Sequence, residues 1–442
     1  MTPGLVVRLR PTGPWRIGPD SGARSRVDSI YHSDSVYAAV TSAFARLGLF
    51  EAWLDATARA AEPAVSFSSC FPFQDDVGFV VPPRTVWPPQ LPAVGPRVHW
   101  KSARFVPLTV VQALVTGAKP NENAWSVDGP SECLVPVGRR GPFRAAVRSS
   151  AAVDRLSGAS ERHSIACLEF RAGAGLWLVA AFRDTSAQER WMNPVKAAFR
   201  LLADSGFGGE RSRGWGRSET PEFREGNLPE MILPAAGDPS GPLPAAREPM
   251  ESPKDPPSSA GAPRQEPAAD APANHDGAGG VASQPDTPSP WSPGDQGPAG
   301  GSSSVAADHT ESAVGVLELE APVEVAGESA EPEAVTQVDP QEAIASETGP
   351  KPHWLLSLFA PAEQDVIDWS RGNYWLVERA GRTDSPAGSG ALKKALQMVG
   401  EGSVVYASAA PSGAAPDVAP GGFPHPVYRA GFAVSVPLPE VS

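Results

Sequence analysis

The sequence has few cysteines, no long apolar run and, in its middle, almost no aromatic residues. Its three cysteines, Cys70, Cys133 and Cys167, form no close pair and no metal-ligand spacing, which argues against a disulfide framework or a zinc site. No stretch of about 18 uninterrupted apolar residues predicts a membrane helix, and the N-terminus lacks the apolar core of a signal peptide. We therefore predict a cytoplasmic protein without a metal or other cofactor.

The middle of the chain is poor in the side chains that build a core. Residues 221–350 hold 22 of the 50 prolines, two aromatic residues, and 4 Lys and Arg against 23 Asp and Glu. Ordering a residue costs about 1 kcal/mol or more, and so few large apolar groups could not offset that cost. We predict a disordered acidic insertion over residues 224–350.

The formal net charge of −13 would normally argue against a nucleic-acid partner, because a polyanion is bound by Lys and Arg. The charge is unevenly distributed, however. Residues 1–220 carry 26 Lys and Arg against 19 Asp and Glu. The part of the chain that can fold before the insertion is therefore basic, and nucleic acid remains a candidate partner.

Hydrophobic spacing predicts an α+β protein. A strand at the N-terminus is followed by a helix that Ser33 would cap, and a second clear helix is predicted over Pro194–Asp204. Two runs around Gly173 predict a hairpin, Ser164–Phe170 with Leu176–Phe182. This order suits a ferredoxin-like module over residues 1–223. Residues 351–442 show further strands, with a helix predicted over Leu392–Met398, and we predict a second ferredoxin-like module there.

The most informative segment is a glycine-rich loop from Gly206 to Arg217. Its five glycines would allow a ligand backbone to approach and amides to turn inward as an anion nest. The loop lacks the ending of a nucleotide-hydrolysing phosphate loop. A flexible loop with solvated arginines is the alternative. The predicted RNA contacts are Gly208, Gly209, Arg211, Ser212, Arg213, Gly214, Trp215 and Arg217, whose cations and ring suit phosphates and a stacked base.

Weaker candidates lie elsewhere. His32 stands at a helix start that could attract an anion, although simple capping by Ser33 explains it equally well. Lys101 and Arg104 belong to a run of alternating cations and rings that suits a single RNA strand, or else an ordinary edge strand. No nucleophile, metal set or acid–base pair is evident, so we predict that the protein is not an enzyme.

Four blocks of sequence resemble the RAMP superfamily of CRISPR proteins, and most closely the fourth Csm subunit of type III-A effector complexes. They are His32–Asp34, Val153–Ser160, Gly206–Arg217, and the pair Gly400–Ser403 with Val427–Gly431. The resemblance covers residues 1–223 and 351–442. It implies two ferredoxin-like, RRM-related modules in an antiviral complex. It also implies binding of the crRNA 5′ handle and docking on a Cas10-type large subunit beside backbone RAMP subunits.

In this resemblance Arg155 and the glycine loop would line one handle-binding groove, with His32 as a weaker candidate. Two rival functions stay open at this stage. A metal-free endoribonuclease would need a histidine, His32 or His163, beside a 2′-hydroxyl. A protein-only assembly scaffold would need no RNA contact. The acidic insertion has no counterpart in the family pattern, and either mimics RNA on the basic groove or stays in solvent.

Overall fold

The computed structural model describes residues 2–18, 23–89, 99–153, 155–234, 349–385 and 388–439. Nearly all of the acidic insertion, residues 235–348, lies outside these ranges, so its predicted disorder stays a prediction. The predicted boundary at residue 223 cuts through a strand, because β11 (Glu222–Leu228) pairs with β1 (Thr2–Leu9) along its length.

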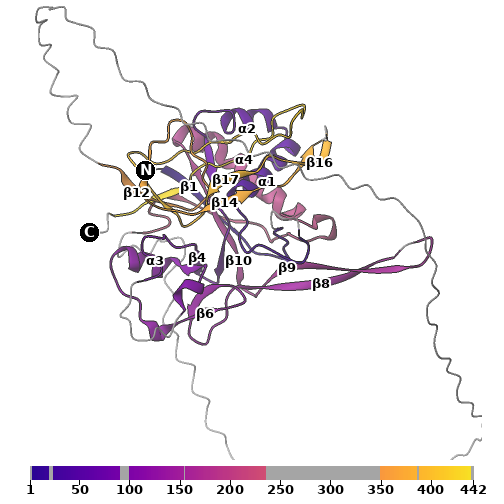
Figure 1. The fold of residues 1–442 in the computed structure, drawn as a ribbon, viewed down its shortest axis with the longest axis horizontal. Coiled ribbons are helices and arrows are strands. Elements are labelled where there is room, and N and C mark those ends of the chain that lie inside the picture. The colour runs from indigo at the N-terminus through magenta and orange to yellow at the C-terminus, as the bar shows by residue number, and fades with distance from the viewer. Residues whose placement is uncertain are drawn as a thin grey trace, which may run out of the picture. The chain divides into compact units, whose positions relative to one another are not determined.

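A seven-stranded antiparallel sheet organises the N-terminal part (Figure 1). Its order is β11-β1-β10-β3-β4-β5, and β2 pairs with β10. The central strand β10 is buried at every position, which explains its continuous apolar run. The remaining bounds are β2 (Val65–Phe67), β3 (Phe71–Gln74), β4 (Val77–Val80), β5 (Val106–Pro107) and β10 (Ala174–Phe182).

Two helices of this part pack against each other and on the sheet: α1 (Ser33–Arg46) and α4 (Thr185–Ser205). Helix α1 is predicted from the spacing of Val36, Val40, Phe44 and Leu47. The first three are fully buried, whereas Leu47 is the C-cap residue and is 41% exposed. Helix α4 begins earlier than predicted, since the Asp184 carboxylate accepts a hydrogen bond from Ala187 N at 2.8 Å and caps it. The shorter helices are α2 (Phe50–Ala56) and α3 (Leu108–Val115), with 3₁₀ turns at Trp100–Ser102, Glu122–Ala124 and Arg211–Arg213.

The predicted hairpin around Gly173 is wrong. Both runs are strands, but they pair with other partners: β9 (Ser160–Phe170) pairs with β8 (Phe143–Val153), and β10 joins the main sheet. Strands β8 and β9 form an eleven-residue antiparallel ladder, visible in Figure 1 as a long ribbon. Local glycine signals predicted the turn correctly and the pairing incorrectly, because pairing depends on which strands the core brings together. A small sheet pairs β6 (Trp125–Asp128) with β7 (Cys133–Pro136).

The C-terminal part is built from strands. Its main sheet has the order β13-β18-β12-β19, and pairs β14-β17 and β15-β16 accompany it. Residues 349–385 and 388–439 contain no helix, so the predicted helix over Leu392–Met398 and the predicted second ferredoxin-like module are both wrong. The bounds are β12 (Lys351–Leu355), β13 (Ile367–Asn373), β14 (Leu376–Arg379), β15 (Arg382–Ser385), β16 (Gly388–Leu392), β17 (Leu396–Val399), β18 (Val404–Ala407) and β19 (Ser435–Pro437).

The two parts of the chain share one hydrophobic core. Trp354 and Leu356 of the C-terminal part belong to the same buried cluster as the helices α1 and α4. Backbone and side-chain bonds cross the boundary: Ser69 N donates to Leu356 O at 2.9 Å, and Trp354 Nε1 donates to Val81 O at 3.2 Å. The C-terminal strands therefore complete the fold of the N-terminal part.

Candidate nucleic-acid interface

The glycine-rich loop follows α4 and lies against the protein's own backbone. Gly208 and Gly216 both have positive φ, and an added Cβ would lie 2.3 Å from Arg16 O or 2.0 Å from Phe207 O. Gly214 also has a positive φ, but its Cβ position has no heavy atom within 4 Å. Gly206 is restricted in the same way, because its added Cβ would lie 2.5 Å from Trp215 O. These three glycines are thus required by close internal packing, whereas Gly214 lies where a ligand has room to approach.

Internal contacts hold this loop in one conformation. The Phe207 ring is buried and stacks on Trp15, with ring centroids 5.2 Å apart. Gly209 N donates to Arg16 O at 2.9 Å, and Gly216 N donates to Pro14 O at 2.9 Å. The alternative of a merely flexible glycine loop does not fit these contacts.

Three amides of the loop point toward a common side. Glu210 has left-handed dihedrals, φ 59° and ψ 25°, and the right-handed 3₁₀ turn Arg211–Arg213 follows it. This succession forms a nest, in which the N–H groups of residues 210, 211 and 212 converge. Within the described part of the chain, none of these three amides donates a hydrogen bond. They are available to an anion.

An open pocket of about 470 Å³ adjoins the nest. Arg211 and Arg46 are both exposed and supply its positive charge. Arg213 contributes less, because its guanidinium lies 3.2 Å from the Glu210 carboxylate. The pocket is lined by Arg46, Ser205, Gly208, Gly209, Glu210, Arg211 and Ser212. Sequence reasoning missed Arg46, which the end of α1 brings beside the loop.

The remaining residues of the loop have different roles. Trp215 is half-buried, so only part of its ring can stack on a base. Arg217 has an exposed side chain, while its carbonyl accepts hydrogen bonds from Thr12 N and from Trp15 Nε1, each at 3.1 Å. The backbone at Arg217 is therefore structural and its guanidinium is accessible.

Lys101 and Arg104 lie outside the glycine loop. Lys101 is exposed on a 3₁₀ turn, so the alternative of an ordinary edge strand does not hold at this residue. Arg104 is half-buried and donates from Nη1 to Ser29 Oγ at 2.7 Å. It lines a separate pocket beside the base of β8.

Arg155 lies in the turn at the tip of the β8–β9 ribbon and is exposed. The base of the ribbon touches the loop region, because Leu168 forms a bridge to Trp15. From Leu168 the strand continues to Ser160, a rise of about 27 Å at 3.4 Å per residue. One RNA groove containing both Arg155 and the glycine loop would have to follow this ribbon.

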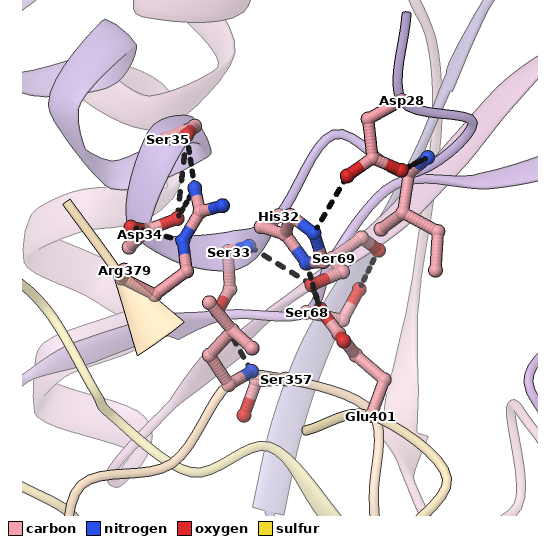
Figure 2. A network of polar contacts seen from close by, with 12 residues as sticks. Asp28, His32, Ser33, Asp34, Ser35, Ser68, Ser69, Ser357, Arg379 and Glu401 are labelled. Atoms are coloured by element: carbon pink, nitrogen blue, oxygen red, sulfur yellow. Dashed lines mark hydrogen bonds and ion pairs between the residues drawn. The ribbon is translucent and has the colours of Figure 1, made fainter. Parts of the chain in front are cut away.

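His32 is buried inside the protein, 4% exposed, and not at its surface. Figure 2 shows both of its ring nitrogens facing carboxylates. Nδ1 lies 2.7 Å from Glu401 Oε1 and Nε2 lies 3.2 Å from Asp28 Oδ2, while Ser69 Oγ donates to the same Glu401 oxygen. An RNA contact by this ring stays a prediction, and its burial disfavours it.

The predicted N-cap role of Ser33 is also wrong. Its hydroxyl accepts a hydrogen bond from Leu358 N at 3.0 Å, across the boundary between the two parts. The residue before the helix is His32, whose side chain makes no capping hydrogen bond, while Ser33 N donates to Ser69 Oγ at 2.9 Å. The hydroxyl is therefore used to join the C-terminal strands to α1.

Asp34 forms the second half of this buried network. Its carboxylate accepts from Arg379 Nε at 3.1 Å and from Arg379 Nη2 at 3.0 Å, and it also pairs with Arg429. Burial alone would raise the pKa of Asp34, but the two guanidinium groups outweigh it and lower that pKa to about 2. The sequence motifs around Asp34, Glu401 and Arg429 thus meet in space as structural contacts.

The His32 contacts predict a pH-dependent stability. Burial lowers the pKa of His32, but Glu401 and Asp28 outweigh it and raise that pKa to about 9. Because the folded pKa exceeds the unfolded value, the stabilisation is complete below about pH 6.5 and is lost as pH rises through about 9. Urea unfolding should show the wild type losing roughly 3 kcal/mol over this window. A His32→Gln variant should lose much less, and equal losses in both proteins would contradict the assignment.

Groups typical of catalysis are poorly placed. All three cysteines are buried, and burial raises the pKa of Cys70, Cys133 and Cys167. Among the described residues, no three His, Cys, Asp or Glu side chains gather as a metal site.

None of the described helices is long and apolar enough to span a membrane.

Comparisons with known proteins give a consistent result. Residues 349–438 match the family described as CRISPR Csm4 C-terminal domain. A chain in a crystal structure of a Csm3–Csm4 subcomplex of the type III-A CRISPR-Cas interference complex is similar in fold, with TM-score 0.50 and 11% identity over 100% of both chains. A chain of a Csm1–Csm4 cassette with cA4 aligns with TM-score 0.45 and 13% identity, covering 100% of this chain and 99% of that one. No curated protein matches the sequence significantly.

Proposed function

We propose that this chain, a Csm4-like RAMP protein, is a non-catalytic RNA-binding subunit of a type III-A CRISPR effector complex. In this proposal it holds the 5′ handle of the crRNA and docks on the Cas10-type large subunit and on a backbone RAMP subunit. The observation that carries the RNA-binding role is the convergence of three unpaired amides with Arg46 and Arg211 on one open pocket.

The chemistry of that pocket suits a phosphodiester. A nest of amides and an exposed guanidinium each donate hydrogen bonds to phosphate oxygens, and charged donors make the stronger bonds. Neither group reads the base, so such contacts position the strand without selecting its sequence. Binding of this kind requires no cofactor and breaks no bond.

The fold supports the same proposal. The strands β11-β1-β10-β3 are adjacent in that order, and α1 and α4 connect them in the succession β-α-β-β-α-β. We interpret this as a ferredoxin-like core for the N-terminal part. The partner proposals are supported by the match at residues 349–438 and by the complexes in which similar chains occur.

A guide-processing endoribonuclease is less well supported. His32 has both ring nitrogens bound to carboxylates and is buried, so it cannot reach a 2′-hydroxyl without leaving this network. His163 lies on the β9 strand, with Glu161 3.8 Å from its Nε2. No observation favours this function over RNA binding.

A double variant tests the proposal. Replacing Arg46 and Arg211 by alanine should weaken RNA binding at least about ten-fold at low salt, and should flatten the salt dependence by about 0.7 per lost phosphate contact. Fluorescence anisotropy with the native guide RNA measures both quantities. Arg190→Ala serves as the matched control, because Arg190 is exposed on α4 and does not line the pocket. Unchanged affinity and slope in the double variant would favour the protein-only scaffold.

A further inference from the structure

A second pocket, of about 330 Å³, lies beside the base of β8. Its walls come from the loop before α1, the turn between β6 and β7, and the strands β8 and β9. Phe143 is buried at 2% exposure and supplies an apolar wall. The pocket is lined by Arg26, Val27, Asp28, Ser29, Arg104, Gly129, Pro130, Ser131, Glu132, Phe143, Ala145 and Leu168.

Three charged side chains in this pocket retain hydrogen-bonding capacity. Arg104 donates only from Nη1, to Ser29 Oγ at 2.7 Å and to Asp28 Oδ1 at 3.3 Å. Its Nε and Nη2, which form the flat edge of the guanidinium, have no bonded partner among the residues that the structure describes. The same holds for the Arg26 guanidinium and the Glu132 carboxylate within those ranges. Hydrogen-bond donors of Arg104 and the two acceptor oxygens of Glu132 thus line the same pocket.

The backbone fixes Arg104 and Glu132 next to each other. The Glu132 carbonyl accepts from Arg104 N at 2.8 Å and from Phe105 N at 3.1 Å. Glu132 itself has a φ of 55°, in the left-handed region that a residue with a side chain rarely adopts. Such conformations cost of order 1 kcal/mol or more and persist where the surrounding structure imposes them. The carboxylate is therefore carried by a constrained turn.

We propose that this pocket binds one guanine base of the RNA strand. The free edge of Arg104 matches the O6 and N7 acceptors of guanine, which is the commonest specific contact between arginine and a base. Glu132 accepts from the N1–H and N2–H₂ donors on the adjoining Watson–Crick edge of guanine. Adenine would place its amino group against Arg104 and offers no N1–H to Glu132. Arg26 then faces the adjoining phosphate.

This inference rests on the proposed function, and the two sites are directly connected. Gly209 of the glycine loop bonds to Arg16, and the next residue, Ile17, accepts from Asp28 N at 2.9 Å. Two such backbone-to-backbone contacts span about 10 Å, because hydrogen-bonded extended segments lie about 4.8 Å apart. Arg16 is buried and its guanidinium donates to the carbonyls of Arg24 and Arg26. An RNA strand whose phosphate is held by the amide nest can therefore continue toward this pocket.

The test is a coupling between base atoms and side chains, measured on the full-length chain. The native handle RNA is prepared with each guanine replaced in turn by inosine, which lacks N2–H₂, or by 7-deazaguanine, which lacks N7. At one position, each replacement should weaken binding to the wild type about ten-fold. The inosine penalty should fall below about two-fold in Glu132→Ala, and the 7-deazaguanine penalty should fall likewise in Arg104→Met. Ratios between two RNAs on the same variant cancel any loss of folded protein.

Two outcomes separate this inference from the proposed function. If no guanine position shows coupling to Arg104 or Glu132 while the Arg46 and Arg211 double variant still weakens all RNAs, the guanine pocket is overturned and RNA binding by the loop stands. If neither the double variant nor any base replacement changes affinity, both are overturned. Coupling at one position alone supports the pocket.

Discussion

Replacing Asp34 by alanine is expected to lower the free energy of unfolding by about 3–5 kcal/mol. The substitution leaves two guanidinium groups, Arg379 and Arg429, without their shared carboxylate in a region where both are buried. Arg379 keeps its bond to Ser35 Oγ and Arg429 keeps its bond to Ala380 O, but both acceptors are neutral, and Arg429 Nε has no hydrogen-bond partner among the described residues. Urea unfolding of the full-length chain at pH 7 measures the loss.

The matched control is Asp55→Ala. Asp55 also pairs with an arginine, Arg59 at 2.8 Å, but its side chain is 66% exposed. Exposed pairs of this kind contribute about 0–1 kcal/mol because water and salt screen them. A loss of similar size in the two variants would show that the Asp34 pair is not a buried junction between the two parts of the chain.

Replacing Gly208 by alanine is expected to weaken RNA binding by roughly 10- to 100-fold, corresponding to one or two charge-assisted hydrogen bonds. The new Cβ would lie 2.3 Å from Arg16 O in a left-handed conformation, so the loop has to shift away from Arg16. The shift moves the amides of residues 210–212 away from the phosphate. Anisotropy with the native guide RNA measures the affinity.

Gly214→Ala separates this displacement from backbone strain. Gly214 has a similar φ, 78°, but no heavy atom lies within 4 Å of its Cβ position. Alanine there should cost about 1 kcal/mol of strain and leave the nest in place. We expect a loss of RNA affinity of less than about five-fold. Equal losses for the two variants would contradict the idea that the packing of Gly208 positions the nest.

Some features followed from local sequence alone. The spacing of Val36, Val40 and Phe44 predicted α1, because a helical period needs no knowledge of the rest of the chain. The five glycines and three arginines of the Gly206–Arg217 loop predicted an anion-binding candidate for the same reason. The N-cap assigned to Ser33 failed because the hydroxyl found a distant partner, Leu358 N.

The pairing of strands and the contacts of charged residues could not be predicted from the sequence and are known only from the structure. The sequence predicted strand β9 correctly but predicted β10 as its partner. In the structure, β9 pairs with β8, the strand before it. From the sequence, RNA contact and simple capping by Ser33 explained His32 equally well, and only the structure shows that Glu401, 369 positions away, lies against its ring.

By itself, the sequence determined the basic character of residues 1–220, the composition that sets residues 224–350 apart, and the glycine loop as an RNA candidate. Composition and short periodicities are properties of neighbouring residues, so they are readable without a fold. Tertiary structure alone decided that Arg46 joins the loop, that Glu132 meets Arg104, and that His32 and Asp34 hold the two parts together. These contacts join residues far apart in the chain, and only the shared core fixes which of them meet.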